Sequence, residues 1–283
     1  MSPNVVSVGG ILLDVDSGGS FRSVTDLAGW DDTPAVRSGI VVKAQQDGGW
    51  DATGFSDVRV VTITGTVAEA SAQAAYTVAQ QLAALRPQQA IEFIVANASI
   101  GSLSAMVRVT VGVKPAWIGD TSFDYTLQIT APDPLKYGPP TYGYATLSTS
   151  TPGAGRIWPR AWPTDWGIPA GVTPGAVAVP NAGTAAYWPR LRVDGPSPNP
   201  TVSMVETGAW VRYGGTLLAG QWLDFDMANR RVLLQGQVSV RQLVSSSGDW
   251  LAVPVGGGSV AWTDDGGDPA AKLSVWGYEL AVS

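Results

Sequence analysis

The sequence has 283 residues, enough for two domains that each bury a core. It contains neither cysteine nor histidine, which removes disulfides, thiolate chemistry and the commonest general base and metal ligand, so we expect no enzyme, cofactor or metal centre. The net charge of −6 and the lack of a long apolar run argue against sequence-specific nucleic-acid binding and against membrane insertion.

The first part of the chain, residues 1–135, combines strand patterns with a single helix. Residues 5–8 and 11–15 are separated by Gly9-Gly10 and predict a hairpin. A loop at 45–56 follows the strand pattern at 38–43. Other strand patterns lie at residues 21–27, 57–66, 91–95, 105–113 and 123–131. About eight strands and one helix predict a small barrel or curled sheet with the helix against one side.

Residues 57–66 give the strongest strand pattern of this part. Val58 and Val60 point to one side and Val61 and Ile63 to the other. Because both sides carry apolar side chains, we expect both faces of this strand to be covered.

The helix is expected over residues 69–85. Thr66 and Glu69 have the spacing of a capping box, and Pro87 ends the helix. Its apolar stripe consists of Ala75, Val78, Leu82 and Leu85. The other positions are nearly uncharged, which favours an outer face close to another subunit.

Residues 136–180 have a different composition. They are rich in Pro and Gly, which interrupt regular structure, and they contain Trp158, Trp162 and Trp166. The indoles predict an inter-domain segment anchored to a domain surface.

Residues 181–283 predict a second, all-β domain. Short strand patterns recur with turns every 8–12 residues, which is typical of a β-sandwich. The expected strands are 188–193, 202–205, 209–213, 221–226, 231–235, 237–243, 258–263, 273–276 and 279–282.

Several motifs resemble, in their order along the chain, the distal tail protein family of siphophages. The first part ends in APDPLKY at 131–137, similar to the Asp-Pro-aromatic signature that closes the family's N-terminal domain. The second part opens with VPNAGT at 179–184 and WPRLRVDG at 188–195, similar to the family's entry strand. The remaining matches are Asn199-Pro200, Asp224-Phe225-Asp226, Arg231-Val232, Gly236 and Trp276.

The resemblance implies a mainly β protein with a barrel-like N-terminal domain, one helix and a galectin-like C-terminal sandwich. It implies a hexameric ring that joins the tail tube protein to the tail-tip or tail-associated hub protein of a baseplate, with the sandwiches facing outward. It also implies assembly in the host cytoplasm and a place at the distal end of the tail in the virion. Edge strands and loops of residues 1–135, including the loop at 45–56, are expected to form the ring.

The alternative function is a carbohydrate-binding module or host-receptor-binding tail component acting through the sandwich. Aromatic side chains stack on sugar rings, and the chain has 12 tryptophans. The candidates for stacking on host cell-wall glycan are Trp210, Trp222, Trp250 and Trp262. Core packing and subunit burial are the competing explanation for these residues.

Three groups of carboxylates could carry chemistry in principle. Asp224 and Asp226 share one strand face and could bind a cation, although pairing with Arg230 or Arg231 is the simpler expectation. The acidic stretch at 264–268 lacks the spacing of an EF-hand loop and predicts a polar hairpin.

A glycosidase pair is the third possibility. Glu206 with Asp224 would have to flank a cleft at a set separation, which the sequence cannot place.

Overall fold

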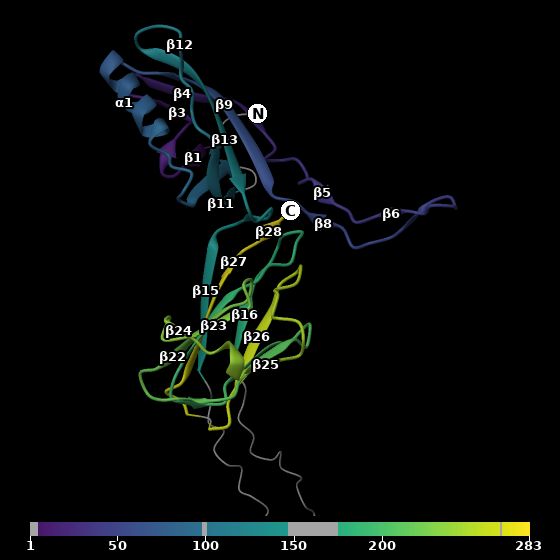
Figure 1. The fold of residues 1–283 in the computed structure, drawn as a ribbon. Coiled ribbons are helices and arrows are strands. Elements are labelled where there is room, and N and C mark those ends of the chain that lie inside the picture. The colour runs from purple at the N-terminus through teal and green to yellow at the C-terminus, as the bar shows by residue number, and fades with distance from the viewer. Residues whose placement is uncertain (1–4, 98–100, 147–174, 267) are drawn as a thin grey trace, which may run out of the picture. The chain divides into compact units, whose positions relative to one another are not determined.

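A computed structural model describes residues 5–97, 101–146, 175–266 and 268–283. The chain divides into two compact units, residues 1–138 with Ser283 and residues 139–282 (Figure 1). Strands predominate in both units, and the helix lies in the first. Within the described ranges, no helix has the length and apolar character needed to cross a membrane.

The first unit is built on one antiparallel sheet whose strands follow the order β2-β1-β10-β11-β13-β9-β4-β3. The strands of this path are β1 (Val5–Val8), β2 (Ile11–Leu12), β3 (Val15–Ser17), β4 (Ser20–Ala28), β9 (Arg59–Ala68), β10 (Ile91–Asn97), β11 (Gly101–Val111) and β13 (Ser122–Ala131). Two short strands join it, β12 (Ala116–Trp117) on β13 and β14 (Lys136–Tyr137) on β11. The predicted hairpin is confirmed by the pairing of Ser7 with Leu12, although β2 ends at Leu12.

The sheet is curled but open. Its path ends at β2 and β3, and no ladder joins these two strands in the described part of the chain. The strands therefore form the expected curled sheet, but the sheet does not close into a barrel.

Strand β9 corrects another expectation. Its inward side chains, including Val61 and Ile63, are fully buried, but Val58 and Val60 are 41% and 43% exposed. The pattern Val-Val-Thr-Ile-Thr places β-branched side chains on both faces, because such residues favour strands whether or not a layer covers them. Only one face of β9 is covered within the unit.

Helix α1 (Ala72–Ala83) packs its predicted stripe into the core of the first unit. Ala75, Val78 and Leu82 are buried, with Ala79 beside them. The cap differs from the prediction, because the Ser71 hydroxyl accepts the Ala74 amide at 3.2 Å. The capping box is therefore wrong: the helix begins after Ser71, at Ala72.

The second unit is a two-layered β-sandwich. One sheet has the order β15-β27-β17-β22-β23-β24 and the other β16-β26-β19-β20-β25. The strands are β15 (Pro140–Thr146), β16 (Gly175–Val179), β17 (Arg190–Asp194), β18 (Ser197–Pro198), β19 (Thr201–Met204), β20 (Trp210–Tyr213), β21 (Thr216–Leu217), β22 (Trp222–Asp226), β23 (Arg231–Leu234), β24 (Val238–Ser239), β25 (Val244–Ser246), β26 (Gly258–Thr263), β27 (Lys272–Tyr278) and β28 (Ala281–Val282).

Most strands of the sandwich lie where the sequence predicts them. The expected strand at 237–243 is an exception, because after β24 the chain makes a 3-10 turn, η1 (Arg241–Leu243). Strands β15 and β16 also lie within the segment 136–180, where the sequence predicts interruption. They form because β27 and β26, distant in sequence, supply their backbone partners. Trp158, Trp162 and Trp166 lie outside the described residues.

Candidate functional site: the arm of the first unit

The segment between β4 and β9 forms an arm that projects from the sheet of the first unit (Figure 1). It consists of two short antiparallel pairs, with β5 (Val36–Arg37) on β8 (Phe55–Ser56) and β6 (Val41–Val42) on β7 (Gly49–Trp50). The expected loop at 45–56 is thus the returning half of a hairpin. The expected strand at 38–43 is reduced to the two residues of β6.

The arm exposes an unusual number of large apolar side chains. Val42 is 79% exposed and Trp50 is 67% exposed. The others that lie mostly in solvent are Val36, Ile40, Val41 and Phe55. Clusters of this kind mark surfaces that bind another protein. A two-stranded hairpin is also marginally stable alone, so the arm requires a surface to pack on.

The base of the arm is fixed by Arg59, the first residue of β9. Its side chain is buried, and Nη1 donates to the carbonyl oxygens of Gly29, Trp30 and Asp32, where the arm departs. The Asp32 contact measures 2.6 Å, and Nε donates to the Pro134 carbonyl at 2.9 Å. One guanidinium therefore ties the outgoing chain of the arm to its return.

A second cation lies beside this anchor. Lys136 Nζ donates to the Trp30 carbonyl at 3.0 Å and lies 5.3 Å from the centre of the Trp30 ring. Burial and the positive charge of Arg59 lower the pKa of Lys136, while Asp31, whose carboxylate is 4.0 Å away, opposes the shift. Burial also lowers the pKa of Arg59. The two cations are held by carbonyl oxygens and an aromatic ring, an arrangement that orders the backbone at the base of the arm.

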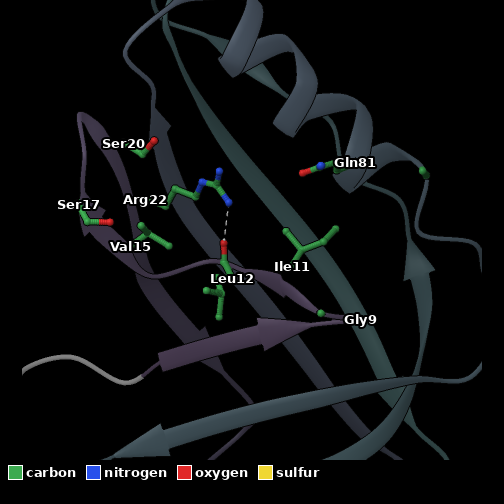
Figure 2. Close-up of a pocket in the computed structure, with 10 residues that line it drawn as sticks. Gly9, Ile11, Leu12, Val15, Ser17, Ser20, Arg22 and Gln81 are labelled. Atoms are coloured by element: carbon green, nitrogen blue, oxygen red, sulfur yellow. Dashed lines mark hydrogen bonds between the residues drawn. The ribbon is translucent and has the colours of Figure 1, made fainter.

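A pocket of about 610 Å³ lies at the open edge of the sheet, between the β1–β2 hairpin and helix α1 (Figure 2). Among the described residues that line it, Arg22 is the only one with an ionisable side chain, and it donates to the Leu12 carbonyl at 3.1 Å. It is also paired with Glu69 at 2.8 Å. Ser20, which also lines the pocket, donates its hydroxyl to Glu69, so Ser20 and Arg22 hold the same carboxylate.

The four tryptophans proposed for sugar stacking do not lie together. Trp250 and Trp262 are buried, at 4% and 0% exposed, so their ring faces are occupied by the core. Trp210 lies on β20 and Trp222 on β22, in different sheets. Trp210 is 36% exposed, whereas the Arg192 guanidinium covers one face of Trp222 at 4.3 Å from the ring centre.

The candidate carboxylates have structural partners. Asp224 accepts from the Trp222 indole at 3.0 Å, and Asp226 is bonded to Asn229 and lies 3.8 Å from Arg231. Glu206 accepts from the Ser259 amide and follows β19, in the sheet opposite to that of Asp224. The Glu206 and Asp224 pair is therefore not brought together. The described residues contain no group of three or more side chains suited to a metal ion.

The loop at 264–268 is likewise held by its neighbours. Asp264 accepts from the Ser197 hydroxyl, and Asp265 accepts from Asn199 and Arg212. These bonds fix the loop as a polar connection, apart from residue 267, which lies outside the described part.

Sequence reasoning missed the anchor at Arg59. An arginine at the start of a strand is ordinarily solvated, and its four carbonyl partners come from segments up to 75 residues away. The arm itself left a signal in the sequence, because a Gly-rich loop would not ordinarily contain so many apolar residues: Val41, Val42, Trp50 and Phe55.

Solved structures share this architecture along the whole chain. The crystal structure of SPP1 Dit (gp 19.1), described as a paradigm of the hub adsorption apparatus in phages that infect Gram-positive bacteria, matches with a TM-score of 0.62 and 14% identity over 99% of both chains. A chain of the phage P2 baseplate, in its activated conformation with Ca, matches with a TM-score of 0.50 and 8% identity over 95% of this chain and 94% of that one, and so does its counterpart with Sr. No family model and no curated protein matches the sequence. The chain therefore has the fold of the distal tail protein resembled by its motifs.

Proposed function

We propose that this chain is a structural adaptor at the distal end of a long-tailed phage tail. Identical copies form a closed ring that joins the tail tube protein to the tail-tip or hub protein of the baseplate. Residues 1–135 build the ring, and residues 181–283 together with β15 and β16 present the sandwich outward. The chain is assembled in the host cytoplasm and has no enzyme activity in this role.

The observation that carries the proposal is the arm. Its apolar side chains lack a covering layer within the described part of the first unit, and Arg59 holds its base in a defined position. An arm on one side of a subunit makes a head-to-tail contact with the next copy, and such contacts close into rings when the rotation closes. The number of copies, six, is what the family resemblance of the motifs implies.

The shared fold also supports a position in the tail. SPP1 Dit is described as a hub protein and the other neighbours are baseplate chains. The absence of histidine and cysteine from the sequence agrees with a structural role, because it removes the usual nucleophile and base pairs.

The oligomeric state tests this proposal. Light scattering of the full chain at tens of micromolar should give a mass six times the 29.4 kDa of the chain. Val42→Lys places a charge on the arm's apolar surface and should reduce the mass to that of one copy, because an unpaired charge is costly to bury. Val255→Lys is the matched control, since Val255 is an exposed valine of the second unit.

Two results would refute the ring. One is a wild-type chain that remains a monomer in light scattering. The other is the absence of a ring of this protein from tail particles viewed by electron microscopy. If Val255→Lys abolished assembly while Val42→Lys did not, the arm would be excluded as the contact surface.

A further inference from the structure

A second exposed surface lies on the outward side of the six-stranded sheet of the second unit. Tyr142 and Tyr144 on β15 and Trp276 on β27 are 54%, 63% and 41% exposed. The ring centroids of Tyr142 and Trp276 are 5.4 Å apart, and those of Tyr142 and Tyr144 are 6.4 Å apart. The three rings form one continuous aromatic surface.

The direction of these rings follows from Gly143 between the two tyrosines. A side-chain carbon at Gly143 would lie only 2.4 Å from Val177 Cγ1 on β16, in the opposite sheet. Gly143 therefore faces the interior of the sandwich. Successive residues of a strand point to opposite faces, so Tyr142 and Tyr144 point outward.

Polar side chains continue this face across the next strands. Tyr144 pairs with Ser274, Ser274 with Arg192, and Arg192 with Asp224, so these side chains share one side of the sheet. On the same side, Lys272 Nζ lies 4.7 Å from the centre of the Tyr144 ring.

These polar groups are held in place by one another. The Arg192 guanidinium lies 4.3 Å from the Trp222 ring centre and donates to Asp194 at 2.8 Å. The hydroxyls of Tyr142 and Ser274 are 3.3 Å apart and share a hydrogen bond. Side chains that are already ordered lose less entropy when a ligand binds.

The composition of this face distinguishes it from the arm. The outward positions of β15, β27, β17 and β22 hold no Val, Leu, Ile or Met, whereas the arm exposes mainly aliphatic side chains. The charges on these four strands balance, with three cations and three carboxylates: Arg190, Arg192, Lys272, Asp194, Asp224 and Asp226. Aromatic rings beside balanced polar groups suit a ligand that is itself polar, uncharged and covered with hydroxyl groups.

We propose that the outward face of this sheet binds an uncharged saccharide chain. The negative faces of Tyr142, Tyr144 and Trp276 receive the C–H groups of the sugar rings. Arg192 and Asp194, whose side chains are 35% and 33% exposed, exchange hydrogen bonds with the hydroxyls, and the buried Ser274 orders Tyr142 through their shared hydrogen bond. The site replaces the sequence-based set, of which only Trp222 lies on this face. It does not depend on the proposed ring, although several copies would strengthen attachment through multivalency.

Native affinity electrophoresis of the full chain tests this site. The gels contain one of four neutral polysaccharides: dextran, glycol chitin, galactomannan or hydroxyethyl cellulose. The wild-type chain should be retarded by at least one of them. Tyr144→Ala and Trp276→Ala should each weaken the retardation roughly tenfold, as expected when an aromatic side chain central to a contact is truncated.

Trp210→Ala is the matched control, because Trp210 is an exposed tryptophan of the other sheet and should leave retardation unchanged. Thermal unfolding of each variant shows that the fold is kept. Failure of all four polysaccharides to retard the wild type, or wild-type retardation of Tyr144→Ala, would overturn the proposal. A fall of the Tyr144→Ala assembly to monomers would also overturn it, because the face would then be a subunit contact. A monomeric wild-type chain that is still retarded would refute the ring alone.

Discussion

Glu69 is a buried residue whose contacts differ from the helix-capping role that its spacing from Thr66 predicts. Its side chain is only 4% exposed, and it accepts from the Ser20 hydroxyl and from Arg22 Nε. Burial opposes ionisation, but the hydrogen bonds from Ser20 and Arg22 and the charge of Arg22 outweigh it, so the pKa of Glu69 is lowered. The carboxylate therefore links β4 to the chain that leads into helix α1, which explains why it does not cap that helix.

This ion pair should make stability depend on pH. A group whose pKa is lowered by folding stabilises the protein above its unfolded pKa of about 4.3, and the gain is lost as the pH falls through the folded value. Glu69→Gln should therefore lower the free energy of unfolding by about 2 kcal/mol at neutral pH, and the difference from the wild type should shrink in acid. Urea unfolding at pH values above and below this range measures it. Glu92→Gln, at an exposed carboxylate, is the control, and a constant difference at every pH would contradict the assignment.

At the scale of elements, the arm and helix α1 differ in how well local sequence describes them. Three members of the predicted stripe, Ala75, Val78 and Leu82, are buried in the helix, because 3.6-residue periodicity reports burial directly; the fourth, Leu85, follows the helix end at Ala83. The arm was predicted as a strand and a loop because its strands are two residues long and leave no periodic pattern. The cap of the helix is Ser71, and the anchor of the arm is Arg59. Hydrogen bonds seen only in the structure identify both.

The anchor predicts a local loss of order in the arm. Arg59→Met removes donors from four carbonyl oxygens, three of them at the departure of the arm, and should cost about 3 kcal/mol. Amide hydrogen exchange should increase in residues 29–58 and in the residue pairs of β4 and β9 that lie next to the arm. Arg37→Met is the control, because the Arg37 side chain is 69% exposed in the same arm. Equal exchange in the two variants would show that Arg59 does not hold the arm.

At the scale of the whole molecule, the two exposed surfaces lie in different compact units. The arm, whose exposed side chains are mainly aliphatic, belongs to the first unit, whereas the aromatic face belongs to the second. Residues that share no contact partners are expected to act independently.

The two proposed functions should therefore be separable by mutation. Val42→Lys should abolish assembly and retain some polysaccharide retardation, with any reduction due to lost multivalency. Tyr144→Ala should retain assembly and lose retardation. Light scattering and affinity electrophoresis on the same preparations test both, and a variant that loses both properties while remaining folded would contradict the separation.

The β-rich class, the single helix, most strands and the family resemblance are all legible in the amino-acid sequence. These properties are encoded by composition, by side-chain periodicity and by the order of motifs, all of which are local along the chain. The tertiary structure alone decided which apolar residues are exposed, because exposure depends on whether another layer covers a strand face. Trp250 and Trp262 are buried, whereas Tyr142, Tyr144 and Trp276 are exposed. The tertiary structure also brought Arg59 to carbonyls distant in sequence and left the sheet open, since pairing partners and register arise only when separate segments meet.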